Sequence, residues 1–491
     1  MIVNDIHSRL NPTRPGRLVQ VDSLSSLRAA VIDTRGSRMS IAGGRHAMGG
    51  QQFTSGGTVL DTRGMARVLH FDQQRGLVEI EAGIQWPELV DHLLAAQVGQ
   101  HQQWGIAQKQ TGANYFTVGG SVSANCHGRG LTMAPMVADV EALRLVRADG
   151  SVITCNRHQN PELFGLVVGG YGLFGAIYSV TLRLARRTML ERVVDVVSVQ
   201  QLMEEVPQRI SAGFRYGDFQ FAVDPASPDF LARGVFSCYR PVNDDRPILA
   251  NQRALGPADW QSLLVLAHTD KSRAFDLYAR HYLATSGQRY WSDLHQLAVY
   301  LDDYHDDLDR RLGAEQTGTE MISELYVPRN RLPDFMAAAA DELRRRDADL
   351  VYGTVRFIEP DKETYLAWAR EDYACIVFNL HTPHTPEGVA HTATTFRCLI
   401  DLAIERGGSY YLTYHRWADA EQVLACYPHF ADFLNLKRRY DPEELFHSDW
   451  YQHYATLFPA ARTGLGDLHL YGPLGWDGIT CGVRWCPTAA R

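Results

Sequence analysis

The chain has 491 residues, of which 45% are hydrophobic and 21% charged, and its 48 Lys and Arg against 56 Asp and Glu give a net charge of −8. This composition is that of a globular protein and excludes a disordered chain, a collagen-like repeat and a pure coiled coil. The acidic balance makes nucleic acid and anionic membranes poor candidate partners. The length fits about three domains, or two large ones, with a core that needs no disulfides.

The eight cysteines are scattered and form no CxxC pair, which favours reduced, buried thiols over a structural zinc site. Cys481 and Cys486 are close enough in sequence for a disulfide, although free thiols are the expectation. Residues 1–15 lack an apolar stretch of signal-peptide length, and no run approaches 18 apolar residues. The expected compartment is therefore the cytoplasm, and no transmembrane helix is predicted.

Short strands and helices separated by glycine-rich turns are predicted in the first third of the chain. Strands at 17–22 and 39–42 flank a helix at 23–35, for which Ser23 is the predicted N-cap. The next predicted elements are a hairpin-like segment at 58–64, two strands with a central turn at 68–83, a helix at 86–96, and strands at 140–155 and 176–184. This is an α+β pattern without the strict βαβ alternation of a nicotinamide-binding sheet.

A second α/β region is predicted from about residue 186 to residue 415. Its strand candidates lie at 191–199, 217–224, 236–240, 320–328, 349–358 and 373–382. Its helix candidates start near Val199 and lie at 254–267, 331–346, 362–370 and 392–407, and a last helix follows at 426–440. Because no low-complexity linker separates the two regions, two interlocked domains are predicted.

Three glycine-rich segments, each next to a predicted strand, are the main functional signal. They read IAGGRHAMGGQQ at 41–52, TVGGSVSANCHGRG at 117–130 and VGGYGLFGAI at 168–177. Glycine removes the Cβ barrier to positive φ, so successive N–H groups can turn inward around an anion such as a diphosphate. One such segment is also what an ordinary turn looks like, but three within about 140 residues indicate a long ligand wrapped by backbone.

In this order the three segments resemble the FAD-binding domain of the vanillyl-alcohol oxidase superfamily, the PCMH-type FAD-linked oxidases. The resemblance covers residues 15–185 and resumes at YDPEELF, 440–446. The second segment is most similar to the decaprenylphosphoryl-ribose oxidase and aldonolactone or alditol oxidase branches. The resemblance implies a two-domain α+β fold: an FAD-binding domain at 1–187, an α/β substrate-binding domain on an antiparallel sheet at 188–418, and a segment at 419–491 that returns to the FAD-binding domain.

The resemblance also implies FAD as the cofactor and indicates which residues would hold it. In the family, the first segment holds the FAD diphosphate, the second lines the cofactor and the third closes the domain. The expected FAD-contacting residues are Gly43, Gly44, Arg45, His46, Ala47, Gln51, Gln52, Gly112, Thr117, Gly119, Gly120, Ser121, Asn125, Cys126, His127, Gly175 and Ile177. As a lone histidine, His127 could equally be a hydrogen-bonded core residue.

His46 falls where some relatives carry a histidine bonded to the 8α carbon of the flavin. The segment GRHAMGGQ is similar to the pattern of the cytokinin branch, so FAD covalently attached through His46 is expected. The alternative is a histidine that is only hydrogen-bonded within its loop. Residues 112–116 contain no cysteine, so a second covalent attachment is not expected.

Four residues are candidates for the chemistry, because oxidation of an alcohol by a flavin is helped by a group that takes the hydroxyl proton. Strand alternation puts Glu324 and Tyr326 on one face, and Glu324 falls where alditol oxidases place an acidic site residue. Tyr414 and His415 stand near the position of a lysine in the relatives. The alternative for all four is a polar strand face or a satisfied core hydrogen bond.

Substrate contacts are predicted for Arg356, Asn379 and His381. Arg356 and Asn379 fall near pocket positions of the ribose-oxidase branch, and Asn379 and His381 share a strand face. The H-x-x-H spacing of His381 and His384 has Pro383 inside it and does not suit a helical zinc site, so no metal is expected.

The sequence thus predicts an FAD-dependent oxidoreductase that oxidises a hydroxyl group of a sugar, polyol or glycosylated small molecule. Hydride would pass to flavin N5, and oxygen or another acceptor would reoxidise the flavin. Two alternatives remain: C=C reduction or desaturation on the same fold, and a non-catalytic binding protein that keeps the fold. Flavin absorbance of the purified protein would separate the enzyme from the last alternative.

Overall fold

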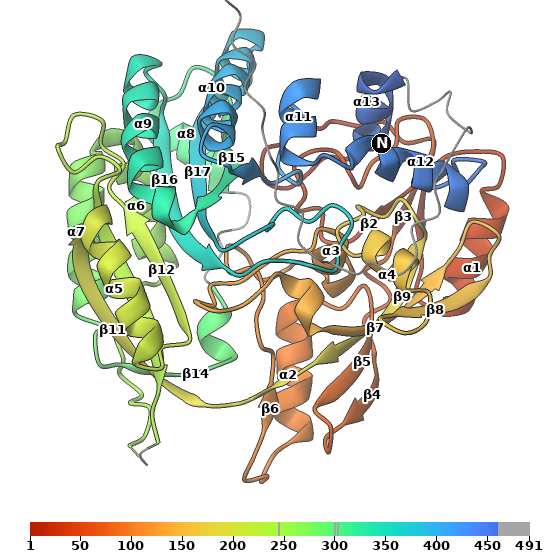
Figure 1. The fold of residues 1–491 in the computed structure, drawn as a ribbon, viewed down its shortest axis with the longest axis horizontal. Coiled ribbons are helices and arrows are strands. Elements are labelled where there is room, and N and C mark those ends of the chain that lie inside the picture. Colours follow the sequence, from red (N-terminus) through yellow and green to blue (C-terminus); the bar gives the residue numbers. More distant parts are fainter. Residues whose placement is uncertain (244–245, 299–300, 302–303, 460–491) are drawn as a thin grey trace, which may run out of the picture.

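The computed structural model describes residues 1–243, 246–298, 301 and 304–459, and Figure 1 shows them as helices packed around β-sheets. The first sheet is parallel, with the order β1 (Arg17–Gln20), β3 (Thr58–Asp61), β2 (Met39–Ala42). Helix α1 (Leu24–Asp33) joins β1 to β2. Its N-cap is Ser23, whose side chain accepts the N–H of Ser26, as the sequence predicts.

The second sheet is antiparallel and has five strands, with a small two-stranded sheet beside it. The order of the larger one is β4 (Val68–Asp72), β5 (Leu77–Glu81), β9 (Ala176–Arg183), β7 (Val140–Val146), β8 (Val152–Asn156). The smaller one pairs β10 (Ala185–Arg186) with β6 (Trp104–Gly105). Helices α2 (Trp86–Ala96), α3 (Val118–Ser123) and α4 (Pro161–Val167) lie in the same part of the chain.

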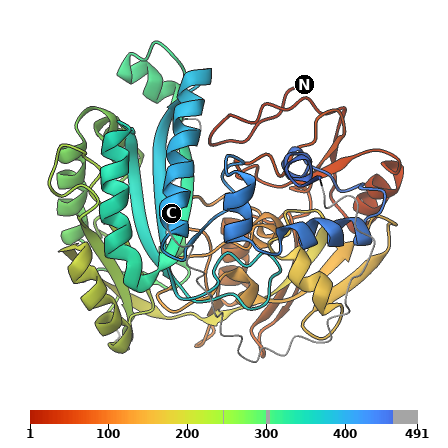
Figure 2. The same cartoon turned by 45° about the horizontal axis from the view of Figure 1, so that its top comes forward.

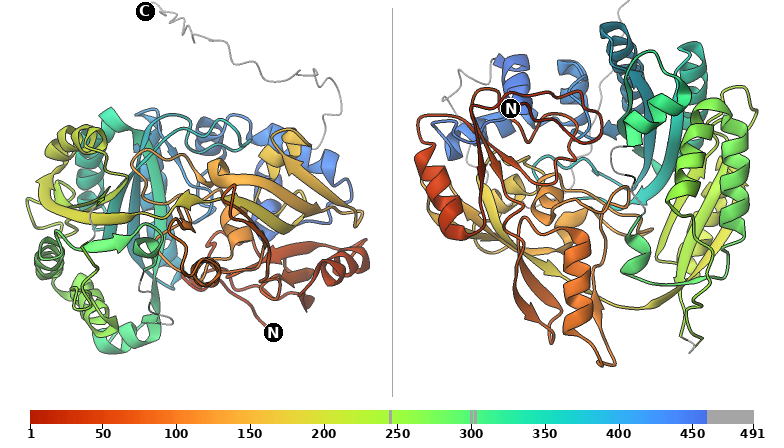
Figure 3. Two further views of the ribbon diagram at one scale, coloured as in Figure 1. Left: turned by 90° about the horizontal axis from the view of Figure 1, so that it is seen from below. Right: turned by 180° about the vertical axis from the view of Figure 1, so that it is seen from behind.

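The largest sheet has eight antiparallel strands and comes from the middle of the chain, as predicted. Its order is β14 (Arg289–Trp291), β11 (Met189–Ser198), β13 (Arg233–Pro241), β12 (Tyr216–Phe221), β16 (Leu350–Ile358), β17 (Tyr373–Pro383), β15 (Gly318–Pro328), β18 (Ser409–Tyr410). Figure 3 shows this sheet and its helices on one side of the molecule and the N-terminal sheets on the other.

Alternation along these strands gives the large sheet one apolar and one polar face. Phe221 and Phe378 belong to the apolar face and pack together, and the helical residue Phe335 packs against Phe378. Helices α5 (Val199–Ser211), α9 (Leu332–Arg345) and α10 (Pro386–Ile404) cover strands of this sheet. Helix α6 (Pro257–Thr269) contacts β16, α7 (Lys271–Leu283) contacts β11 and β13, and α8 (Tyr304–Leu312) contacts β15.

The end of the described chain returns to the N-terminal sheets. The helices there are α11 (Ala420–Cys426), α12 (Phe430–Tyr440) and α13 (Asp449–Leu457), and Figure 2 shows α12 and α13 over the N-terminal part of the chain. Phe446 pairs with Met39 in a parallel bridge, which extends the edge of the first sheet. Buried Leu445 and Phe446 join the same hydrophobic cluster as Leu27 and Val31 of α1.

Three predicted elements were wrong. Residues 58–61 are not part of a hairpin but form the buried central strand of the parallel sheet. Residues 140–155 are two strands, because Gly150 at φ +76° closes a turn between them. Residues 362–370 form no helix: Asp361 caps the N–H groups of residues 363 and 364, and Trp368 Nε1 donates to a carbonyl of the second glycine-rich segment.

No helix of the described residues is both long and apolar enough to cross a membrane. The cysteine pair near the C-terminus, Cys481 and Cys486, lies outside the described residues. The other six cysteines are free thiols, and five of them are buried.

Candidate functional site

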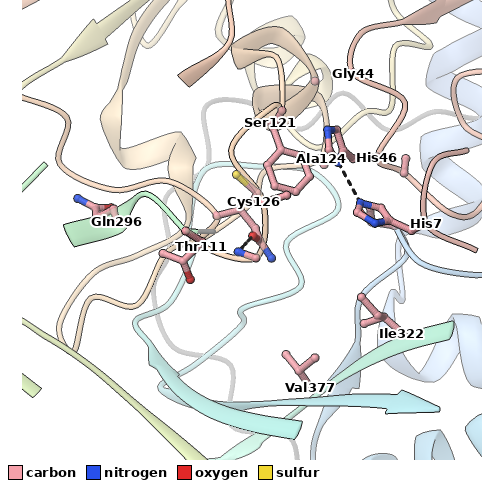
Figure 4. Close-up of a pocket in the computed structure, with 18 of the residues that line it drawn as sticks. His7, Gly44, His46, Thr111, Ser121, Ala124, Cys126, Gln296, Ile322 and Val377 are labelled. Atoms are coloured by element: carbon pink, nitrogen blue, oxygen red, sulfur yellow. Dashed lines mark hydrogen bonds between the residues drawn. The ribbon is translucent and has the colours of Figure 1, made fainter. Parts of the chain in front are cut away.

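A cavity of about 610 Å³ lies between the glycine-rich segments and the polar face of the large sheet (Figure 4). Gly44, His46 and Ser121 line it from the N-terminal part of the chain, while Ile322 of β15 and Val377 of β17 line it from the sheet. One continuous space therefore connects the two parts of the molecule.

Most residues predicted to contact FAD line this cavity. They are Gly43, Gly44, Arg45, His46, Ala47, Gln51, Gln52, Gly112, Thr117, Gly119, Gly120, Ser121, Cys126, Gly175 and Ile177. Asn125 and His127 do not line it. The Asn125 amide is used inside the protein, where it donates to Asp361 at 2.8 Å and accepts the N–H of Val137 at 3.0 Å.

The glycines of the cavity wall are required by close backbone approach. A Cβ on Gly44 would lie 2.4 Å from the carbonyl oxygen of Tyr115, and one on Gly119 would lie 2.7 Å from the Cβ of Ala82. The next residue, Arg45, has φ of 61°. The backbone N–H groups of Gly44 and Arg45 form no hydrogen bond with another described residue. This cradle of amide donors fits the diphosphate of a dinucleotide cofactor.

His46 is held by a second histidine that the sequence did not indicate. Its Nδ1 lies 2.9 Å from Nε2 of His7, and its ring packs on Phe116 with centroids 4.1 Å apart (Figure 4). Its Nε2 is buried and forms no hydrogen bond with the described residues. Burial, with His7 adding to it, lowers the pKa of His46 well below its usual value, so the imidazole is neutral. No spacing pattern relates residues 7 and 46.

Glu324 and Tyr326 do not line the cavity but form a buried cluster behind its wall. The Glu324 Oε1 atom lies 2.6 Å from His127 Nε2 and accepts the Tyr326 hydroxyl at 2.7 Å and the Cys375 thiol at 3.1 Å. Burial opposes the carboxylate charge, but His127 and these hydrogen bonds lower the pKa of Glu324 to about 2. The cluster thus ties the second glycine-rich segment to strands β15 and β17.

Of the two neighbouring candidates Tyr414 and His415, only Tyr414 lines the cavity. Tyr414 lines the cavity, and burial raises the pKa of its hydroxyl well above 10, so it remains an O–H donor. His415 does not line the cavity. Its Nε2 lies 3.0 Å from the hydroxyl of Ser323, and its ring stacks on Phe396.

The sheet wall of the cavity carries two of the three predicted substrate contacts. Arg356 and Asn379 line the cavity, and Arg356 Nε and Nη1 and Asn379 Oδ1 are buried without hydrogen-bond partners among the described residues. Tyr352 and Thr354 share a face of β16 with Arg356, because the three occupy every second position, and they line the cavity too. His381 does not line it, and its Nδ1 lies 3.5 Å from Glu320 Oε1.

Beyond this wall the cavity continues over β11, β12 and α7, where the sequence did not indicate site residues. The side chains there are mainly cationic and aromatic: Arg129, Arg192, Asp218, Arg253, Trp260, Tyr278, Tyr282 and Tyr290. Asp218 and Gln220 alternate along a strand that was predicted, so the alternation applied to β15 and β17 would have identified them.

Comparison with known proteins agrees with the geometry of the glycine-rich cradle. Residues 15–156 match the family model described as the FAD binding domain. The chain is 23% identical to an L-gulono-1,4-lactone dehydrogenase of Mycobacterium tuberculosis over 89% of this chain and 95% of that protein. It is 30% identical to cytokinin dehydrogenase 8 of Oryza sativa over 32% of this chain and 31% of the relative. It is also 30% identical to the L-gulonolactone oxidase of Mus musculus over 31% of this chain and 33% of the relative.

The match of residues 15–156 to an FAD-binding domain confirms the predicted resemblance to the FAD-linked oxidases. The similarity to named oxidoreductases extends over most of the chain at low identity. The cofactor class follows from these findings.

Proposed function

We propose that this chain is an FAD-dependent oxidoreductase that oxidises a hydroxyl group of a sugar, polyol or related small molecule, with its FAD attached through His46. When bound, FAD accepts a hydride from the substrate and passes the electrons to oxygen or another acceptor. The observation that carries the proposal is one cavity that joins the glycine cradle, the unpartnered Nε2 of His46 and a polar sheet wall.

The residues that line the cavity suggest which part of the chain binds the cofactor and which part binds the substrate. Residues 1–187 would bind FAD, residues 188–418 would bind the substrate, and the segment from residue 419 would close the FAD-binding part. The parallel bridge between Phe446 and Met39 supports the last assignment. The unpaired amides of the first glycine-rich segment would hold the diphosphate, because they can donate to its oxygens without displacing another acceptor.

Attachment through His46 requires one tautomer. His46 must carry its proton on Nδ1 and donate it to His7 Nε2, so that the lone pair of Nε2 is available for the bond to the flavin. The bond from Nε2 would replace a C–H bond of the flavin 8α carbon; the flavin ring itself would take the two electrons and be reoxidised by the same acceptor, and His7 is placed to take the Nδ1 proton. His7 is therefore a positioning residue for the attachment, and its replacement should lower the covalent fraction without abolishing FAD binding.

The substrate side of the cavity suits a hydroxyl-rich molecule. Arg356 offers donors and Asn379 offers an acceptor, and the atoms concerned have no hydrogen-bond partner among the described residues that a ligand would have to displace. The Tyr414 hydroxyl lines the same cavity. A buried donor or acceptor without a partner costs free energy, which a ligand with several hydroxyl groups would recover. The gulonolactone-related names of two similar proteins support a sugar-derived substrate.

The proposal is tested by anaerobic reduction of the bound flavin. The holoprotein is mixed with a panel of sugars, aldonolactones and polyols, and bleaching of the flavin absorbance is followed by stopped flow. At least one member of the panel should reduce the flavin in wild type. Oxygen and an artificial acceptor are then compared for reoxidation. If none of these compounds reduces the bound flavin, but a reduced nicotinamide or a compound that is desaturated to an enone does, the result would favour C=C reduction or desaturation instead.

A further inference from the structure

A second cluster of ligand-type side chains surrounds Glu320 on strand β15. Glu320 and His381 are opposite each other in the register of β15 and β17, and His268 comes from α6. The Glu320 Oε1 atom lies 3.5 Å from His268 Nε2 and 3.5 Å from His381 Nδ1. The ligand atoms of these three residues all lie within 4.8 Å of one another.

These separations suit a shared ion better than direct hydrogen bonds. His268 Nε2, His381 Nδ1 and Glu320 Oε1 are all buried, and none of them has a hydrogen-bond partner within the described part of the chain. Two tetrahedral ligands, each about 2.1 Å from zinc, are themselves about 3.4 Å apart. The two 3.5 Å distances match that geometry, and the His268 and His381 rings are perpendicular, at 89°.

The other carboxylate oxygen is held by a second group of side chains. The hydroxyl of Tyr304 donates to Glu320 Oε2 at 2.5 Å, and His305 Nδ1 lies 2.9 Å from the same atom. Groups of this kind orient a ligating carboxylate and fix which oxygen faces the metal. Glu320 also lines the large cavity, which leaves room for a water or a cavity ligand at a fourth position.

We propose that His268, Glu320 and His381 bind one divalent transition-metal ion, with zinc as the best fit to two imidazoles and one carboxylate. The proposal departs from the expectation of no metal that was drawn from the sequence. Its ligands are more than fifty residues apart along the chain, so no short motif contains them, and only the pairing of β15 with β17 brings two of them together. It does not depend on the proposed alcohol oxidation.

The test measures zinc on untagged, flavin-loaded protein after dialysis against a chelator. Zinc chloride is titrated in competition with a chromophoric chelator, and cobalt(II) is added to a second sample of wild type. Wild type should take up one zinc per chain with submicromolar affinity and show visible cobalt bands of four-coordinate geometry in the difference spectrum. His268→Ala, Glu320→Gln and His381→Ala should each weaken zinc binding at least about 100-fold.

The matched control is His429→Ala, because the His429 side chain is 73% exposed and far from the cluster in sequence. It should bind zinc like wild type, and retained flavin absorbance in every variant shows that the fold persists. Wild type that takes up less than about 0.1 zinc per chain and gives no cobalt bands would overturn the proposal. So would equal zinc binding by wild type and His381→Ala, since the zinc would then be bound somewhere other than this cluster.

Discussion

Replacing Glu324 by Gln should destabilise the fold more than it slows catalysis. Glu324 is 1% exposed, and its Oε1 serves His127 and the Tyr326 hydroxyl at once. The variant keeps one acceptor oxygen for the three groups around Oε1, the Cys375 thiol included, and adds an amide that needs its own acceptor. The pKa of Glu324 falls from 4.5 to about 2 on folding, because the favourable effect of His127 outweighs the burial that opposes the charge.

The magnitude follows from that pKa. A group whose pKa is lowered on folding stabilises the folded state above its unfolded pKa of 4.5, and this contribution is lost as pH falls through about 2. The difference between these values corresponds to about 3 kcal/mol at pH 7. Removing the acceptor of a buried hydrogen bond to a charged group typically costs about 1–3 kcal/mol or more, which is of the same size.

The assay is denaturant unfolding of the holoprotein at pH 7, followed by flavin fluorescence and far-ultraviolet circular dichroism. Glu204→Gln on the exposed side of α5 is the control and should change the free energy of unfolding by less than about 0.5 kcal/mol. Flavin reduction by the substrate should slow less than about 10-fold in Glu324→Gln. Unchanged unfolding together with a loss of about 10³-fold or more in flavin reduction would refute this reasoning and make Glu324 a catalytic residue.

Three further predictions concern the cavity and its supports. Burial lowers the pKa of Lys109 from 10.5 in the unfolded chain to about 7 in the folded protein. Between these pH values the Lys109 amine carries a proton only in the unfolded chain, so the free energy of unfolding should rise by about 1.4 kcal/mol per pH unit. Lys109→Met should flatten that rise in unfolding curves, and parallel curves would contradict it. Gly119→Ala should weaken FAD binding at least about 10-fold in fluorescence titration, since its Cβ would lie 2.7 Å from that of Ala82. Gly256→Ala, with 3.6 Å to the nearest atom, should bind FAD normally, and equal binding by both variants would refute the cradle. Arg356→Met should raise KM about 10-fold or more with a smaller change in kcat, because its unpartnered donors face the cavity; an unchanged KM would remove it from the substrate site.

The sequence predicts the local elements well where the hydrophobic period is clear. Helix α2 has the predicted bounds, and the strands of the large sheet follow their alternating patterns. The sequence-based prediction fails where contacts between residues far apart in the chain determine the local structure. Residues 58–61 are central only because β1 and β2 enclose them, and residues 362–370 lose a helix to contacts with Asn125 and Asp361.

The candidate site divides in the same way. Glycine-rich segments need particular backbone conformations, so they are visible in the sequence, and the cradle residues were identified from it. Glu324 and Asn379 were chosen by one rule of strand alternation, yet only Asn379 reaches the cavity, because the FAD-binding part of the chain covers Glu324 with His127. His7 could not be found, since its role depends only on a contact with His46.

The central claim is tested most directly by acid precipitation of the purified protein. The pellet is washed, its flavin fluorescence is read in a denaturing gel, and the intact mass is measured. Wild type should keep its flavin and show the added mass of one FAD, His46→Ala should release the flavin into the supernatant, and His7→Ala should give a mixture of both. Flavin released by wild type would contradict the attachment through His46. No flavin in either fraction, even after incubation with FAD, would contradict the assignment of a working FAD site in this cavity.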